Sequence, residues 1–254
     1  MVHTVAALAV LLALASPAAG IPPPMTLHYD VRWGPLTIMS LDTTIDVGDT
    51  TYRSTTAMRT EGVVALAFPW KATAESNGVR DGATLAPRSH KADGEYRGEH
   101  RRVRIEYAAD GGVDTQVEPP PDDDARDLVP PEMQRATLDP ITASLSAAGR
   151  PCTGTLPVFD GRRRYDMRFE DMGAADVEPA RRAVYAGPAR RCRATIVAKS
   201  GFWRSDPRDS EAPTTLDYWI AAPSADVGPI PVYLELSGAR GTLAIHLTAI
   251  EPTP

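Results

Sequence analysis

Residues 156–169 read Leu-Pro-Val-Phe-Asp-Gly-Arg-Arg-Arg-Tyr-Asp-Met-Arg-Phe. In the second half of this stretch, Tyr165, Met167 and Phe169 alternate with charged residues, which is typical of a strand with one buried face. Asp160 and Gly161 separate it from an apolar run. Asp-Gly suits the two positive φ angles of a type I′ turn, whose twist matches the strands that it joins. The stretch therefore predicts an antiparallel hairpin.

The same period-two alternation recurs along the chain. It is found in residues 27–33, 52–59, 102–107, 232–236 and 243–247, and Gly-rich turns follow at 110–112 and 238–241. Strands joined by such turns favour an antiparallel sheet over βαβ units. The sequence predicts a mainly β protein with a single curled antiparallel sheet, as a half-barrel or β-spiral, and one or two short helices.

The concave face of this sheet is expected to carry the alternating apolar side chains. A slip of one residue would send a whole set to the other face, so each strand contributes all of its set or none. The nine candidates for the concave face are Tyr29, Val31, Trp33, Val103, Ile105, Tyr107, Tyr165, Met167 and Phe169.

One segment reads as a helix with proper ends. Asp139 can cap it, Pro140 suits the first helical position, and Gly149 ends it. We expect this helix, from Pro140 to Ala148, to pack Ile141 and Leu145 against the concave face. Residues 62–68 suit either a short helix or a buried strand.

The segment from Pro119 to Pro131 is rich in proline and contains the acidic run Asp122–Asp124. Proline removes a ladder hydrogen bond, so the segment is predicted to be an exposed loop. Neither half of the chain shows a helical layer of its own. Residues 21–254 are therefore expected to form one β domain.

The first twenty residues are predicted to be a secretory signal peptide. They contain no Lys, Arg, Asp or Glu, and an apolar core at residues 5–15 precedes the small residues 16–20. An uncleaved buried helix is the alternative. The apolar run is shorter than the roughly 20 residues that span a bilayer. Cleavage near residue 20 would leave a periplasmic chain with no integral membrane segment.

Two cysteines, Cys152 and Cys192, follow the predicted cleavage site. Two cysteines in an exported chain suggest one structural disulfide. A free redox thiol and half of a metal site are the alternatives. Neither has a Cys-x-x-Cys or Cys/His spacing to support it.

No catalytic motif is found in the sequence. Nucleophile-elbow, zinc-protease, P-loop and dinucleotide-binding patterns are missing, so no catalytic residue, cofactor or metal is predicted. The net charge of −6 argues against binding to nucleic acid. The histidines at 28, 90, 100 and 246 are interpreted as surface or satisfied residues.

Each of two charged features can be interpreted either as an ordinary solvated surface or as a ligand site. The acidic run at 122–124, with Asp127, is a solvated loop or a calcium site, and it lacks the ligand spacing of a calcium loop. Arginine clusters at 101–104, 162–164, 181–182 and 190–193 either cover solvent faces of strands or bind phosphates and lipid headgroups.

Several pieces of the sequence together resemble the domain of unknown function 3108 family, which comprises exported proteins of Gram-negative bacteria. The pieces are Leu27-x-Tyr29-x-Val31, Arg59-Thr60-Glu61-Gly62, Asp139-Pro140, Pro151-Cys152-x-Gly154-x-Leu156, residues 158–165 and Tyr185-x-Gly187-Pro188-Ala189 before Cys192. The resemblance covers most of the chain after residue 20. It implies an envelope protein with a curved sheet similar to the half-barrels of lipoprotein carriers, and it supplies no catalytic residues or ligand.

Three functions remain as expectations. The first is a non-catalytic periplasmic protein of the cell envelope that binds a lipid or another hydrophobic ligand in the concave face. The second is a structural or protein-interaction module that pairs an exposed strand edge with an envelope protein. The third is an unrecognised hydrolase, which a buried carboxylate beside His or Ser in a cleft would favour.

Overall fold

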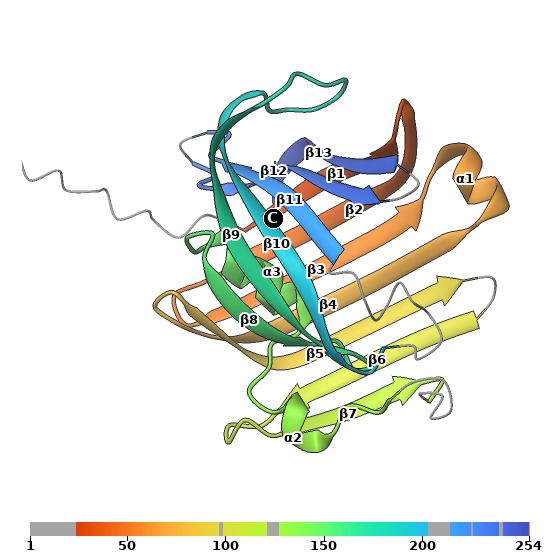
Figure 1. Cartoon of the computed structure of the whole chain (residues 1–254), viewed down its shortest axis with the longest axis vertical. Coiled ribbons are helices and arrows are strands. Elements are labelled where there is room, and N and C mark those ends of the chain that lie inside the picture. The colour runs from red at the N-terminus through yellow and green to blue at the C-terminus, as the bar shows by residue number, and fades with distance from the viewer. Residues whose placement is uncertain are drawn as a thin grey trace, which may run out of the picture.

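The computed structural model describes residues 24–96, 99–120, 127–202, 214–224, 226–238 and 241–253 (Figure 1). The predicted signal peptide and the acidic run at 122–124 lie outside these residues. Thirteen strands and three short helices account for most of the described chain.

The strands are β1 (Met25–Trp33), β2 (Leu36–Val47), β3 (Thr51–Thr60), β4 (Trp70–Asp81), β5 (Thr84–Tyr96), β6 (Glu99–Tyr107), β7 (Val113–Glu118), β8 (Gly154–Phe159), β9 (Arg164–Val177), β10 (Gly187–Ser200), β11 (Thr214–Ala221), β12 (Ile230–Gly238) and β13 (Gly241–Pro252). The helices are α1 (Gly62–Ala67), α2 (Pro131–Gln134) and α3 (Pro140–Ala148). All the strand pairs are antiparallel and form one sheet in the order β7-β6-β5-β4-β3-β2-β1-β13-β12-β11-β10-β9-β8. The predicted fold class is confirmed.

The sheet curls so that its two end strands approach each other, but it does not close into a barrel (Figure 1). Residues 127–139 join the two ends instead. Leu138 forms a parallel bridge with Val158 of β8, and Ala136 donates a backbone hydrogen bond to the carbonyl of Gly111 beside β7. Val129 packs between Ile105 of β6 and Phe159 of β8. The prolines of this segment suit a connection that leaves the strand ladder.

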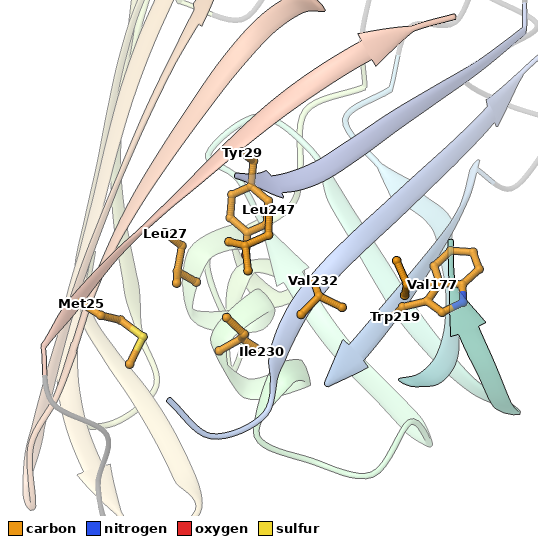
Figure 2. Close-up of a cluster of buried hydrophobic side chains, with 8 residues drawn as sticks. All are labelled: Met25, Leu27, Tyr29, Val177, Trp219, Ile230, Val232 and Leu247. Carbon is orange, nitrogen blue, oxygen red and sulfur yellow. The ribbon is translucent and has the colours of Figure 1, made fainter. Parts of the chain in front are cut away.

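The largest buried cluster lies where β1 meets β11–β13. Figure 2 shows its side chains, which are Met25, Leu27, Tyr29, Val177, Trp219, Ile230, Val232 and Leu247. Tyr29 donates a hydrogen bond from its hydroxyl to the carbonyl of Pro231, at 2.9 Å. This contact satisfies the polar end of an otherwise buried aromatic side chain.

The hairpin between β8 and β9 forms at the predicted place, but its predicted turn type is wrong. The loop spans residues 160–163, and within it only Gly161 has a positive φ. The Asp160 carboxylate accepts hydrogen bonds from the backbone N–H groups of Arg162 and Arg163. This local bonding by an Asp side chain replaces the type I′ geometry.

The helices differ from the expectation in two respects. The described chain has three helices rather than one or two, because residues 62–67 form α1 and the proline-rich segment contains α2. The predicted face of α3 is also wrong. Its buried residues are Thr142, Ala143 and Ser146, whereas Ile141 and Leu145 are half-buried.

Candidate functional site

The concave face of the sheet has a part that α3 covers and a part that it leaves open. α3 lies inside the curl and contacts β4, β5 and β8 (Figure 1). Ala143, at the centre of the helix, packs against Leu156, Val158 and Tyr165. Small residues on this face of α3 permit the close approach, which explains why the larger Ile141 and Leu145 do not form the contact face.

The other side of α3 is held by a buried carboxylate. Asp139 caps the helix by accepting hydrogen bonds from the backbone N–H groups of Ile141 and Thr142, each at 3.0 Å. It also accepts hydrogen bonds from the hydroxyls of Ser76 and Thr142, each at 2.6 Å. Asp139, Ser76 and Thr142 are fully buried. A buried carboxylate is tolerated only with this degree of hydrogen bonding.

The hydroxyl protons in this network have a defined direction. The single hydroxyl proton of Ser76 goes to Asp139, so the Nδ1 atom of His90, 2.8 Å from the Ser76 Oγ, must be the donor in that contact. The hydroxyl of Thr142 is likewise committed to Asp139, so it accepts from the hydroxyl of Tyr52 at 2.6 Å. The network thus runs from Tyr52 on β3 and His90 on β5 inwards to Asp139.

A serine, a histidine and an aspartate in contact invite comparison with a hydrolase triad, but the arrangement differs from one. In a triad the serine donates its proton to histidine and the aspartate orients the far ring nitrogen. Here Ser76 donates to the aspartate, and Ser76 and His90 are 0% and 3% exposed. The described residues therefore bury both the serine hydroxyl and the imidazole. The geometry supports a structural role for the network.

Hydrogen bonds shift the pKa of one group in this network, and burial shifts that of another. Burial alone would raise the pKa of the Asp139 carboxyl, but the contacts from His90, Ser76 and Thr142 outweigh it and lower that pKa below its ordinary value. Burial raises the pKa of the Tyr52 hydroxyl. Asp139 is therefore a carboxylate and Tyr52 a neutral donor at neutral pH.

Apolar side chains of β2, β3, β11, β12 and β13 lie on the concave face away from the strands that α3 contacts, and we call them the open apolar strip. Its members are Met39, Met58, Leu216, Leu236 and Leu243, which are half-buried and lie outside the buried clusters of the described chain. The registers place Leu236 opposite Leu243 and Leu243 opposite Trp33. Met39 is opposite Val31, Met58 opposite Leu41 and Leu216 opposite Ala194. The strip is an apolar surface that none of the described side chains fully covers.

The strand registers place the nine predicted concave residues on this face, but their burial differs. Ile105 is fully buried, and Tyr29, Val31 and Tyr165 are buried. Val103, Tyr107, Met167 and Phe169 are half-buried. Trp33 is 53% exposed because it is the last residue of β1, at the turn to β2.

Cys152 and Cys192 form a disulfide with a Cα–Cα distance of 5.7 Å. It joins the segment that follows α3 to β10. Both cysteines are buried with Ala194 and Tyr218. The bond thereby ties α3 to the wall opposite β4 and β5.

A shallow groove of about 430 Å³ lies over β3–β7. Its polar lining comes from the convex face, opposite α3. It contains three basic side chains (Lys91, Arg102 and Arg104) and three acidic ones (Glu75, Asp93 and Glu118). Arg102 pairs with both Asp93 and Glu118, at 2.8 and 3.2 Å. Charges that cancel in this way do not form a phosphate or carboxylate site.

The arginine clusters are mostly engaged in ion pairs at the surface. Arg191 and Arg193 both bind Asp217, and Arg190 binds Asp171. Asp217 lies on β11, beside these two arginines of β10, and they lower the pKa of its carboxyl. These contacts favour the interpretation of the clusters as solvent faces of strands.

The histidines also have identifiable environments. The Nδ1 atom of His28 lies 2.7 Å from Asp42, and the ring of His246 packs on that of Tyr233. Burial, and then Arg32, lower the pKa of His246. Within the described residues, no group of three His, Cys, Asp or Glu side chains is placed to hold a metal ion.

The roles of Ser76, His90 and Tyr52 are not predicted from the sequence. Asp139 was expected only as a helix cap. Ser76 and His90 lie 63 and 49 positions before it in the sequence, so no local spacing reveals the network. The one signal is polar residues at inward positions of neighbouring strands, and it can be recognised only when the strand register is known.

The fold and the site define a single-sheet protein whose curled sheet holds one helix, α3, which covers part of the concave face. The chain belongs to the family described as protein of unknown function (DUF3108), whose model matches residues 28–248. No curated protein matches the chain significantly.

A solved structure of similar fold is the crystal structure of a beta-barrel-like protein of domain of unknown function DUF1849 from Brucella abortus. The identity is 9% and the TM-score 0.50, and the match covers 91% of this chain and 98% of the Brucella chain. This likeness concerns the fold alone. No helix within the described residues is long and apolar enough to cross a membrane.

Proposed function

We propose that the protein is a non-catalytic, periplasmic component of the cell envelope that binds a lipid or another hydrophobic ligand in its concave face. The observation that carries this proposal is the open apolar strip. Large apolar side chains normally leave water, at a gain of roughly 1.5–3 kcal/mol each. Several of them left half-covered side by side favour an apolar ligand.

The buried network contributes to this function by fixing α3 inside the curl of the sheet. Asp139 and its partners hold one side of α3, and the disulfide and Ala143 hold the other. The helix therefore stays in place without filling the strip. A rigid apolar surface beside a fixed helix suits an acyl chain, which requires shape and apolar contact rather than hydrogen bonds.

A fluorescent fatty acid tests ligand binding directly. Binding to the purified protein should raise its emission, and unlabelled palmitate should displace it. Leu236→Glu places a charge in the strip and should abolish binding. Met172→Glu, which changes a side chain that is 37% exposed on β9, should leave binding intact. Equal binding by the two variants, or no binding by the natural protein, would refute the proposal.

The protein-interaction role is the alternative, and one observation favours it. Strand β7 lies at an end of the sheet, and in the described chain it pairs only with β6. Its free edge can accept a strand from a partner. A substitution in the strip would leave that interaction unchanged, which distinguishes the two functions.

A further inference from the structure

One corner of the molecule exposes a cluster of large apolar side chains, which we call the apolar rim. It consists of Trp33 and Leu36 at the turn between β1 and β2, and Val63, Leu66 and Phe68 in and after α1. Leu66 is 87% exposed, and α1 has no buried residue. Figure 1 shows α1 projecting beyond the sheet beside this turn.

The two parts of the rim are held together by the backbone. The N–H of Glu61 donates to the carbonyl of Ile38 at 2.9 Å, which fixes the start of α1 against β2. Each part belongs to a run without a charged residue, 33–41 in one case and 62–70 in the other. The rim is therefore a single uncharged apolar projection of the fold.

We propose that the apolar rim docks the protein on a lipid bilayer surface. A protein partner fits the rim poorly, because a stable protein interface buries about 800 Å² and some 20–30 residues on each side. The rim offers five large apolar side chains on two hairpin tips. Such a projection suits insertion into the boundary between headgroups and acyl chains.

The residues around the rim agree with this occupant. Trp33 begins the first uncharged run and Trp70 ends the second, and tryptophan favours the membrane–water interface. Behind the tips, Arg59 and Lys71 are opposite each other on β3 and β4 and are exposed, but Arg59 pairs with Asp42 and Glu61, and Lys71 pairs with Glu95. Charge near the rim is therefore balanced, and the docking depends on the apolar side chains and the tryptophans.

The rim is continuous with the concave face, since Trp33 is the cross-strand partner of Leu243 in the open apolar strip. A protein docked by its rim would present the strip to the bilayer. Membrane docking goes beyond ligand binding, and its test requires no bound ligand.

Flotation with vesicles tests the docking. The signal-cleaved protein is mixed with vesicles of phosphatidylethanolamine and phosphatidylglycerol (3:1) or of phosphatidylcholine. We expect it to float with the vesicles. Leu66→Glu should lower the partition coefficient by about tenfold or more, since one large apolar side chain is lost from the interface. Because Leu66 is 87% exposed, the variant should have the same melting temperature as the natural protein.

The matched control is Leu128→Glu, which changes a side chain that is 53% exposed away from the rim. It should float like the natural protein. The proposal is overturned if the natural protein stays unbound to both kinds of vesicle, or if Leu66→Glu floats equally well. A dimer that Leu66→Glu dissociates, without flotation of the natural protein, would instead assign the rim to a second copy. The strip variant Leu236→Glu separates the two proposals, since it should lose the fatty acid and still float.

Discussion

Ser76 on β4 donates a hydrogen bond of 2.6 Å to Asp139, the residue that caps α3. Both residues are fully buried. This contact joins one wall of the curled sheet to the helix inside it. It also explains why the helix can remain fixed beside an apolar surface that it does not cover.

Two neighbouring serines test the energetic weight of this contact. Ser54 is opposite Ser76 on the adjacent strand and is equally buried, but its hydroxyl has no hydrogen-bond partner among the described residues. Ser76→Ala should lower the free energy of unfolding by about 1–3 kcal/mol, because it leaves buried groups unpaired. Ser54→Ala should change it by less than about 0.5 kcal/mol. Urea denaturation measures both, and equal losses would contradict the network.

Asp139 should make stability depend on acid pH. Its pKa is lowered in the folded state, so its contribution is complete above the pKa of an unfolded aspartate, about 3.9. The contribution is lost as the pH falls through the lower folded-state value. The difference in unfolding free energy between the natural protein and Asp139→Asn should be constant from pH 7 to about 5 and then shrink towards pH 2. A difference that stays constant to pH 2 would show that the carboxylate is not stabilised by folding.

Gly78 is expected to be essential for the packing of Tyr52. A Cβ at this position would lie 2.1 Å from the carbonyl oxygen of Ala86 and 2.7 Å from the Tyr52 ring. Gly78→Ala should destabilise the protein by about 1–3 kcal/mol or more through overpacking. Gly94→Ala is the control, because its Cβ would meet only ordinary contacts, the nearest at 3.5 Å. Thermal unfolding should separate the two variants clearly, and similar melting temperatures would refute the packing.

Removal of the disulfide should destabilise the protein without changing its fold. Cys152 and Cys192 close a loop with a sequence separation of 40. The chain-entropy relation gives about 4 kcal/mol for such a loop. The double variant Cys152→Ser and Cys192→Ser should lose up to this amount on chemical denaturation and keep its far-ultraviolet circular dichroism. An unchanged midpoint would show that the bond does not constrain the unfolded chain.

Part of this fold could be predicted from the sequence because some strands carry large apolar side chains at every second position. That pattern predicted β1, β6, β9, β12 and β13. The pattern does not predict β4 and β5, because their inward positions hold Ser76, Gly78 and His90, which face the polar network and α3. A period-two test for apolar residues has no signal there.

The candidate site was predictable to a similar degree. The cap at Asp139 is local and was expected, but its contacts with β4 are a consequence of the curl. The contact face of α3 was predicted from the apolar residues Ile141 and Leu145 on one side of the helix, whereas close packing selected Ala143 and Thr142. The rim could not be recognised in the sequence, since Val63 and Leu66 also suit a buried strand.

Native mass spectrometry of the protein, purified without detergent, tests ligand binding in the concave face most directly. We predict a population whose added mass corresponds to a lipid, and its retention in Met172→Glu. The same preparation of Leu236→Glu should carry no added mass. A natural protein without any lipid adduct, or an adduct that Leu236→Glu retains in full, would contradict the account.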